Sequence, residues 1–234
     1  MARLPRLVLP NHPHHILQSA NDSQLIFRDE DDFQQFLVWL KQSAREFKVA
    51  IHAYVLMPDH LHLLASPSSA EGLAQTMQRV GRYYVPWYNA KYDRSGGLFK
   101  GRFKTSLIDS EKFFMICSRY IESNPVRSQL VSDAADYKWS SYPHHVGVKS
   151  DALITDHALY WALGNTPFQR EAAYRELSRQ LLSEKEMAVV DAAVLKGWPL
   201  GSDTFKTELQ LRAKRQVLPA KRGRPFKIVP PSTN

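Results

Sequence analysis

The stretch VAIHAYVLMPDHLHLLAS, residues 49–66, consists of two apolar runs separated by a Pro-Asp pair at 58–59. Proline followed by aspartate is typical of turns, so the stretch predicts two adjacent β-strands joined by a tight connection. Side chains of a strand alternate between the two faces of its sheet. His60 and His62 therefore point to one face, and the leucines that follow each of them point to the other.

The segments around this hairpin predict an α+β fold. Strands are predicted at 14–20 and 103–108, and helices at 29–48, 71–89 and 111–123. The first six elements then follow the order of a ferredoxin-like βαββαβ core, to which the helix at 111–123 is added. The first and third strands pair at the centre of such a sheet, so His60 and His62 lie on a central strand and face a layer of helices. Pro86 predicts a kink or an interruption in the second helix.

The remainder of the chain predicts a small helical C-terminal region. Helical segments are predicted at 155–163, 168–182 and 184–196, and a further helix begins near Asp203. The segment SEKE at 183–186 has the form of a capping box, which marks a helix start. We therefore divide the chain into a catalytic domain at 1–150, a helical region at 151–208 and a basic tail at 209–234.

Charge along the chain is uneven. The 234 residues carry 31 Lys and Arg against 23 Asp and Glu, a net charge of +8, and 44% of them are hydrophobic, as in a globular protein. Seven of the basic residues and none of the acidic ones lie in the tail, which leaves the rest nearly neutral. A basic tail of this kind indicates a polyanionic partner such as nucleic acid, and the simpler alternative is a terminus that only aids solubility.

Cysteine content and hydropathy indicate the compartment. The single cysteine, Cys117, excludes an internal disulfide and suits a reducing environment. No stretch approaches the run of about 20 apolar residues that a membrane-spanning helix needs. We therefore expect a cytoplasmic protein with no membrane partner.

The histidine pair has two interpretations. Two neutral imidazoles on one face of a strand form a two-point metal ligand, whereas the simpler alternative is a pair of half-exposed histidines on the surface of the sheet. The helix at 111–123 adds Tyr120 and, four residues later, Asn124, which is the spacing of neighbours on one helix face. In the simpler interpretation Tyr120 is a core aromatic residue and Asn124 caps the helix before Pro125.

Chemistry at phosphorus favours the functional interpretation of these four residues. A tyrosine hydroxyl has a pKa near 10, so only about one in a thousand is ionised at pH 7. A divalent cation helps by polarising the phosphate oxygens, with His60, His62 and Asn124 as ligands. Imidazole alone would suit zinc, whereas the carboxamide and a phosphate substrate favour Mg²⁺ or Mn²⁺.

Two motifs resemble those of a known family. The segment HLH, 60–62, is similar to the His-hydrophobe-His motif of the HUH endonucleases. The segment RYIESNPVRSQLV, 119–131, resembles the tyrosine segment of the IS200-like single-tyrosine transposases, specifically the REP-associated tyrosine transposases. The resemblance covers roughly residues 1–145 and continues more weakly at 199–205 and 221–227.

The resemblance implies a Mg²⁺- or Mn²⁺-dependent enzyme that cuts and rejoins single-stranded or hairpin DNA. It implies a 5′-phosphotyrosine intermediate on Tyr120 and a free 3′-hydroxyl, with His60 and His62 as metal ligands and Asn124 in the place of the third. The partner is then DNA at hairpin-forming repeats, and the enzyme is a monomer or a homodimer. The chain departs from its relatives at Asp59, where Asn is common, and at 17–21, where many carry an Arg-Gly pair, which leaves the target sequence open.

Basic and aromatic residues alternate between positions 79 and 104, a composition typical of grooves that bind single strands. The predicted DNA-binding residues are Arg79, Arg82, Lys100, Arg102 and Lys104, together with Arg222 and Arg224 of the tail. The two arginines of the tail suit a narrow minor groove.

Alternatives to this hypothesis remain at the level of sequence. Tyr88 and Tyr92 are other candidate nucleophiles in the same chain, although neither has a polar partner comparable to Asn124. A domesticated DNA- or RNA-binding protein could keep the fold without cutting. A zinc hydrolase could be built on the histidine pair, but no further Asp or His follows at a familiar ligand spacing.

Overall fold

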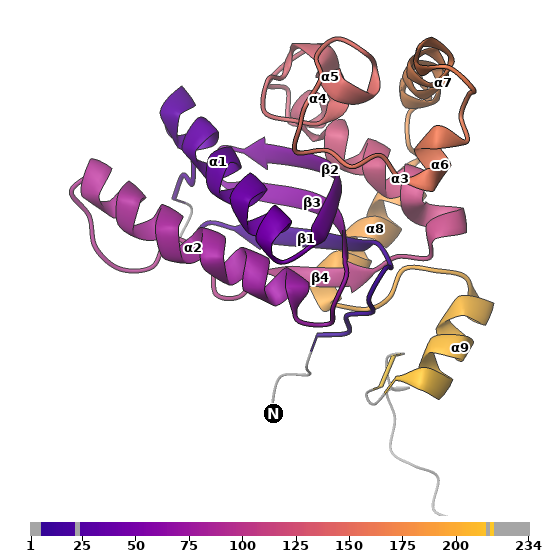
Figure 1. Ribbon diagram of the computed structural model, residues 1–234, viewed down its shortest axis with the longest axis horizontal. Coiled ribbons are helices and arrows are strands. Elements are labelled where there is room, and N and C mark those ends of the chain that lie inside the picture. The colour runs from indigo at the N-terminus through magenta and orange to yellow at the C-terminus, as the bar shows by residue number, and fades with distance from the viewer. Residues whose placement is uncertain (1–5, 22–23, 214–215, 218–234) are drawn as a thin grey trace, which may run out of the picture.

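The computed structural model describes residues 6–21, 24–213 and 216–217 and confirms the predicted α+β fold (Figure 1). Its centre is a four-stranded antiparallel sheet in the order β2-β3-β1-β4. The strands are β1 (His14–Ser19), β2 (Val49–Met57), β3 (His60–Pro67) and β4 (Lys104–Leu107). The first and third strands lie at the centre, as the ferredoxin-like order predicts.

The hairpin quoted first forms as predicted. β2 ends at Met57, β3 begins at His60, and the two residues are paired across the connecting turn. In the pairing of β3 with β1, His60 lies opposite Ser19 and His62 lies opposite Leu17. This register places both histidines on a strand that has neighbours on each side.

Two helices cover one face of the sheet, α1 (Glu30–Glu46) and α2 (Gly72–Lys91). They pack on Leu61 and Leu63 of β3 in the larger hydrophobic core. The N-terminus of α1 is stabilised by a capping box, in which Asp29 accepts from the backbone N–H of Asp32.

The predicted interruption at Pro86 is wrong, because α2 continues through it to Lys91. Proline removes one helical hydrogen bond and costs about 3 kcal/mol inside a helix. Tyr84 and Tyr88, on either side of Pro86, are fully buried and donate hydrogen bonds to the carbonyl oxygens of Ile26 and Leu25. Both halves of α2 are therefore fixed by the core, which outweighs the local penalty.

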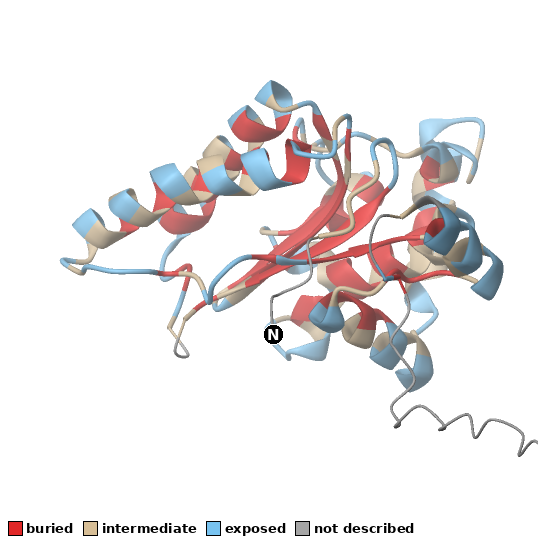
Figure 2. Ribbon diagram, turned by 90° about the horizontal axis from the view of Figure 1, so that it is seen from below, coloured by how far each residue is buried: buried red, intermediate tan, exposed pale blue. Residues whose placement is uncertain are grey.

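The opposite face of the sheet is covered by α3 (Ser110–Glu122) and α8 (Glu184–Lys196). Figure 2 shows the largely buried sheet between the two layers of helices. His62 and Leu64 of β3 point to this second face, and Leu64 packs in a core that includes Tyr120 and Val190. The alternation of side chains along β3 thus separates an apolar face from the face that carries the histidines.

The region after α3 contains more short helices than the sequence predicts. The additional elements are α4 (Asn124–Arg127), the 3₁₀ turn η1 (Ala134–Asp136) and α5 (Tyr142–His145). The helices predicted at 155–163 and 168–182 are shorter, as α6 (Ala158–Trp161) and α7 (Pro167–Arg179). α9 (Asp203–Arg212) crosses the boundary that we predicted at 208–209.

The C-terminal region is attached to the edge of the sheet. The hydroxyl of Ser106 on β4 donates to the carbonyl oxygen of Trp198 at 2.6 Å, and Asp109 accepts from the backbone and side chain of Ser202. These contacts fix the chain that leaves α8, and with it the position of α8 against α3. In the part of the chain that the structure describes, no helix is long and apolar enough to span a bilayer.

Candidate active site

The four residues that the sequence singles out as catalytic or metal-binding come together on the second face of the sheet. Nε2 of His60 lies 3.0 Å from Nδ2 of Asn124. The ring of His60 is 5.2 Å from that of His62, and the ring of His62 is 5.9 Å from that of Tyr120, measured between centroids. Strand β3, helix α3 and helix α4 therefore each contribute to one site.

His60 is held by the residue before it. Its Nδ1 lies 2.7 Å from Oδ1 of Asp59, and its side chain is 23% exposed. A hydrogen bond from Nδ1 to a carboxylate fixes the ring and leaves the lone pair on Nε2. Asp59 thus orients the histidine toward Asn124.

His62 is held by a third histidine, His15 of β1, which the sequence did not single out. Nδ1 of His62 lies 2.8 Å from Nε2 of His15, and both side chains are buried. Burial lowers the pKa of His62 well below its usual value and that of His15 to about 3. Both rings are therefore neutral at pH 7, the form in which imidazole binds metals.

The hydrogen-bonding capacity of the buried histidines His15 and His62 is not fully used. Nδ1 of His15 has no hydrogen-bond partner among the described residues. Buried polar atoms are nearly always paired in native structures, so an orphan indicates a requirement other than stability. When His62 donates from Nδ1 to His15, its Nε2 keeps a lone pair, and the proton of His15 lies on the unpaired nitrogen.

Asn124 occupies a different local structure from the one predicted. α3 ends at Glu122, and Asn124 begins the separate short helix α4, with Pro125 next. Proline has no N–H to continue α3, and its fixed φ suits the first turn of a new helix. The amide oxygen of Asn124 accepts from the hydroxyl of Ser128 at 3.2 Å, so both ends of the carboxamide are occupied.

Tyr120 is 5% exposed and its hydroxyl donates a short hydrogen bond to Oδ1 of Asp191, on α8. The guanidinium of Arg127 lies 4.3 Å from the centroid of the tyrosine ring. Burial, and then the hydrogen bond to Asp191, raises the pKa of Tyr120, while Arg127 acts in the opposite direction. The hydroxyl is therefore protonated at neutral pH.

Asp191 is a site residue that the sequence did not reveal. The pattern at 184–196 predicts the helix, but its contact with Tyr120 spans 71 residues. One signal was present, since Asp191 lies next to Val190, which is buried on the inner side of α8. An acidic residue beside the inner stripe of a helix is a candidate for a polar contact with the layer below.

The donor set fits a divalent cation. Within the described residues, no three His, Cys, Asp or Glu side chains are grouped as a metal site, because here the third donor is a carboxamide. His60 and His62 each have Nδ1 held by a partner, which leaves Nε2 of each as the metal-binding nitrogen, and a carboxamide oxygen is a ligand that Mg²⁺ and Mn²⁺ accept. A bound cation would replace the hydrogen bond between His60 and Asn124 and would need the carboxamide turned so that its oxygen faces His60. The three residues leave coordination positions open for a substrate.

The predicted DNA-binding residues do not form one surface. Arg79 and Arg82 lie on α2, on the face away from Tyr120, and Arg79 forms an ion pair with Glu46. Lys100, Arg102 and Lys104 are exposed beside β1 and β4. The backbone N–H of Lys100 donates to Ser19, the residue that pairs with His60.

Lys100 therefore lies at the His60 end of the sheet, whereas the arginines of α2 do not. Arg222 and Arg224 of the tail lie outside the described residues.

The alternative nucleophiles, Tyr88 and Tyr92, lie on the face of the sheet that α1 and α2 cover. The hydroxyl of Tyr88 donates to the carbonyl of Leu25, and that of Tyr92 donates to Asp29 and Asp32.

Comparison with protein families gives a match to the model described as "Transposase IS200 like" over residues 9–124. This segment runs from before β1 to Asn124 and contains both histidines and the tyrosine. None of the curated proteins matches the chain.

Among solved structures, a REP-associated tyrosine transposase bound to a REP hairpin matches with a TM-score of 0.55. The two sequences are 16% identical, and the match covers 68% of this chain and 96% of the other. This likeness establishes a common fold. A candidate transposase of Deinococcus radiodurans matches with a TM-score of 0.36 at 13% identity, over 49% of this chain and 92% of the other.

Proposed function

The chain belongs to the IS200-like transposase family through residues 9–124, and from this premise we propose that it cuts and rejoins single-stranded DNA. The observation that carries the proposal is the position of Tyr120 beside His60, His62 and Asn124. A nucleophile next to ligands for a divalent cation is the arrangement that phosphoryl transfer to tyrosine requires.

In the proposed reaction, Oη of Tyr120 attacks the scissile phosphorus. The new bond joins the tyrosine oxygen to phosphorus, and the bond from phosphorus to the 3′ oxygen breaks. The departing 3′ oxygen takes a proton from water, so the products are a 5′-phosphotyrosine and a strand that ends in a 3′-hydroxyl. Attack by a 3′-hydroxyl on the phosphotyrosine reverses these steps and rejoins DNA.

Mg²⁺ or Mn²⁺ would be held by His60, His62 and Asn124, and would supply charge stabilisation at the phosphate oxygens. The contribution of the chain is to keep these donors in place. Asp59 orients the ring of His60, and His15 orients that of His62. Partners of this kind fix the tautomer and orientation of histidine ligands.

The proton of Tyr120 must leave as the oxygen bonds to phosphorus, and Asp191 is the group that receives it. The hydroxyl already donates to its carboxylate. Since this hydrogen bond raises the pKa of the tyrosine, Asp191 does not act by ionising Tyr120 in advance. It acts as a general base during attack, and it returns the proton when the tyrosine leaves in the rejoining step.

We propose single-stranded or hairpin DNA as the substrate. The relative with the same fold was solved with a REP hairpin, and Lys100, Arg102 and Lys104 supply exposed positive charge beside β1 and β4.

The test is a search for the covalent intermediate. Hairpin-bearing single-stranded DNA, labelled in turn at each end, is incubated with the protein and Mn²⁺ and separated on a denaturing gel. We expect a protein adduct that retains the label 3′ to the cut, and a released fragment that ends in a 3′-hydroxyl. Tyr120→Phe should form no adduct while its fold and its affinity for DNA change little.

Tyr84→Phe is the matched control. It also removes one buried hydroxyl, one that donates to the carbonyl of Ile26 at 2.6 Å, but it lies on the other face of the sheet. This variant should lose stability by about 1–3 kcal/mol and still form the adduct. Binding without an adduct in the wild type would instead support a domesticated DNA-binding protein, and an adduct with Tyr120→Phe would remove Tyr120 from the reaction.

A further inference from the structure

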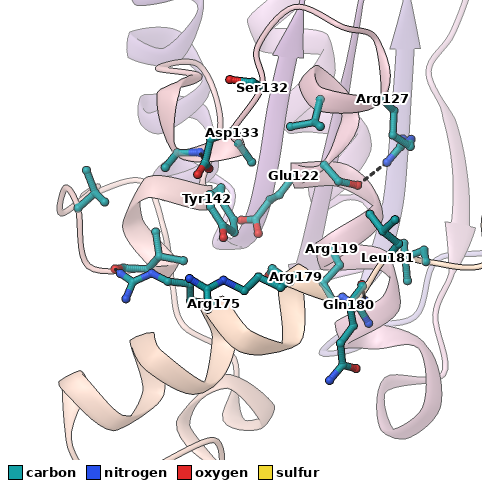
Figure 3. Close-up of a pocket in the computed structure, with 18 of the residues that line it drawn as sticks. Arg119, Glu122, Arg127, Ser132, Asp133, Tyr142, Arg175, Arg179, Gln180 and Leu181 are labelled. Atoms are coloured by element: carbon teal, nitrogen blue, oxygen red, sulfur yellow. Dashed lines mark hydrogen bonds between the residues drawn. The ribbon is translucent and has the colours of Figure 1, made fainter.

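A cavity lies against α3, the helix that carries Tyr120. It has a volume of about 420 Å³ and is enclosed by the C-terminal end of α3, by α4, by the loop and turn at 132–135, by α5 and by α7 (Figure 3). This volume is within the range of about 300–1,000 Å³ that is typical of sites for small ligands. Nothing in the proposed cutting reaction uses this space.

The lining of the cavity carries more positive than negative charge, four arginines against two acidic residues. The arginines are Arg119, Arg127, Arg175 and Arg179. Arg119 and Arg175 donate to the carbonyl oxygens of Gln180 and Val146 respectively. Arg127 donates to the carbonyl oxygen of Tyr120 and to the hydroxyl of Ser123.

None of Arg119, Arg127 and Arg175 forms a salt bridge with a carboxylate of the described chain, and Nε of Arg119 is buried without a partner. Burial lowers the pKa of both Arg119 and Arg127, although Glu186 acts in the opposite direction on Arg119 and Asp191 on Arg127. A guanidinium remains charged in proteins, so an anion in the cavity would offset the penalty of burial.

The two carboxylates in the cavity wall, those of Glu122 and Asp133, accept hydrogen bonds from groups other than the arginines. Glu122 accepts hydrogen bonds from Ser141, from His145 at 2.6 Å and from Tyr174 at 2.5 Å. Asp133 accepts from the backbone N–H of Ala135 at 2.8 Å. Neither acid therefore neutralises the arginines directly.

The rest of the lining is mainly apolar and includes one aromatic ring, with Ser123, Ser132, Ser178 and Gln180 as its other polar residues. The apolar side chains are Val126, Ala134, Ala135, Val146, Val148, Leu181, Leu182 and Met187, and the ring is that of Tyr142. Figure 3 places Tyr142 and Glu122 close together, with Arg175 and Arg179 along one edge. Apolar walls, an aromatic ring and guanidinium groups are the surroundings in which proteins bind an unstacked base with its phosphate.

The cavity adjoins the nucleophile through Arg127. This side chain lines the cavity and also lies 4.3 Å from the centroid of the Tyr120 ring. A strand whose phosphate lies at Tyr120 therefore has a neighbouring nucleotide within reach of the cavity. This continuity favours a nucleotide of the bound strand over a free one.

We propose that the cavity binds one nucleotide of the cut strand next to the scissile phosphate, with its base in the apolar part and its phosphate between Arg119, Arg127 and Arg175. The inference rests on the proposed function, since it takes the strand to lie at Tyr120. Such a subsite would select the base beside the cut by direct contact.

The test uses binding rather than cutting, so it does not depend on whether the protein forms an adduct. In a Tyr120→Phe background, Ala135→Trp fills the cavity from its wall. Ala172→Trp is the matched control, because it adds the same ring to the exposed side of α7, outside the cavity. Affinities are measured for a hairpin-bearing single strand and for a series in which one nucleotide at a time is abasic.

We expect Ala135→Trp to weaken binding of the intact strand roughly tenfold, the size of one stacked base, and Ala172→Trp to have no effect. The loss should vanish for DNA that is abasic at one position next to the cut. Equal affinities, or a loss that persists at every abasic position, would overturn the proposal.

Arg175→Gln provides a second variant should the tryptophan disturb folding. It removes one phosphate contact, so the log–log salt slope of binding should flatten by about 0.7. An unchanged slope with a folded protein contradicts the proposal. Competition by millimolar free deoxynucleoside monophosphates, with no dependence on abasic position, would assign the cavity to free nucleotides and overturn the strand model.

Discussion

Tyrosines on the two faces of the sheet have different partners. On one face, Tyr84 and Tyr88 donate to backbone carbonyl oxygens and tie α2 to the segment before α1. On the other face, Tyr120 donates to the side chain of Asp191. A carbonyl can only accept the hydrogen bond, whereas a carboxylate can also take the proton. Burial is similar in the three cases. Tyr92 and Tyr174 also donate to carboxylates, so Tyr120 is distinguished by having both a carboxylate partner and a position beside His62.

The histidines show the same contrast. Both ring nitrogens of His52 are occupied, by the carbonyl of Thr155 at 2.7 Å and by the hydroxyl of Ser66 at 2.9 Å. Nδ1 of His62 is paired with His15, whereas both nitrogens of His60 are occupied, Nδ1 by Asp59 and Nε2 by Asn124, which is itself a proposed ligand. A histidine with one nitrogen anchored and the other directed at further donors is suited to bind a metal ion.

The largest effect that would test this contrast is expected at His60. His60→Ala should abolish adduct formation and weaken Mn²⁺ binding, measured by calorimetry, because it removes a ligand. Since the ring is partly exposed, the melting temperature should change little. His52→Gln is the matched control and should retain the adduct. Full activity of His60→Ala would show that the metal binds elsewhere and would contradict the distinction between His60 and His52.

The next effect concerns Asp191. Asp191→Asn keeps the size of the side chain but cannot take a proton, so adduct formation should slow by roughly 10²- to 10⁴-fold. The remaining rate should rise with pH more steeply than in the wild type, as hydroxide replaces the base. The other charged or titratable groups that face Tyr120 are Arg127, His15 and His62.

The readout is the single-turnover rate of adduct formation as a function of pH. Glu184→Gln, at an exposed position on the same helix, should leave the profile unchanged. Partial rescue by Asp191→Glu would strengthen the assignment. A rate for Asp191→Asn above that of the wild type would mean that the carboxylate slows the attack of Tyr120 on phosphorus.

A smaller effect is expected when the basic residues near His60 are compared with those on α2. Replacing Lys100 and Arg102 together by Ala should flatten the log–log salt slope of single-strand binding by about 1.4, at roughly 0.7 for each phosphate contact. The same replacement of Arg79 and Arg82 should leave the slope unchanged. Equal effects of the two pairs would show that DNA crosses both faces.

The smallest effect is on stability against pH. Burial lowers the pKa of His52 to about 4. The unfolded chain takes up this proton below about pH 6.5 and the folded chain only near pH 4, so stability should fall as the pH falls through that range, by at most about 3 kcal/mol. His52→Gln should reduce the slope, as measured by denaturant unfolding. An unchanged slope would mean that His52 does not contribute.

The sequence predicted the elements with strong periodicity and missed the contacts between distant residues. The hairpin has the predicted bounds because strand alternation and a Pro-Asp turn are local signals. The error at Pro86 arose because tertiary packing of Tyr84 and Tyr88 overrides a local penalty. His60, His62 and Tyr120 were identified from motifs, whereas His15 and Asp191 were not, because their roles depend on pairing across 47 and 71 residues.

The position of Asp191 has a consequence for evolution and for protein engineering. The proposed nucleophile and the proposed metal ligands lie within residues 9–124, while their acidic neighbour Asp191 is carried by α8, beyond that segment. The segment 9–124 and the region that contains α8 can therefore diverge separately in sequence. In chimaeras that exchange the region from α7 onward between relatives, the preference for a metal should follow the segment 9–124. The rate of attack by the tyrosine, and its dependence on pH, should follow the exchanged region from α7 onward.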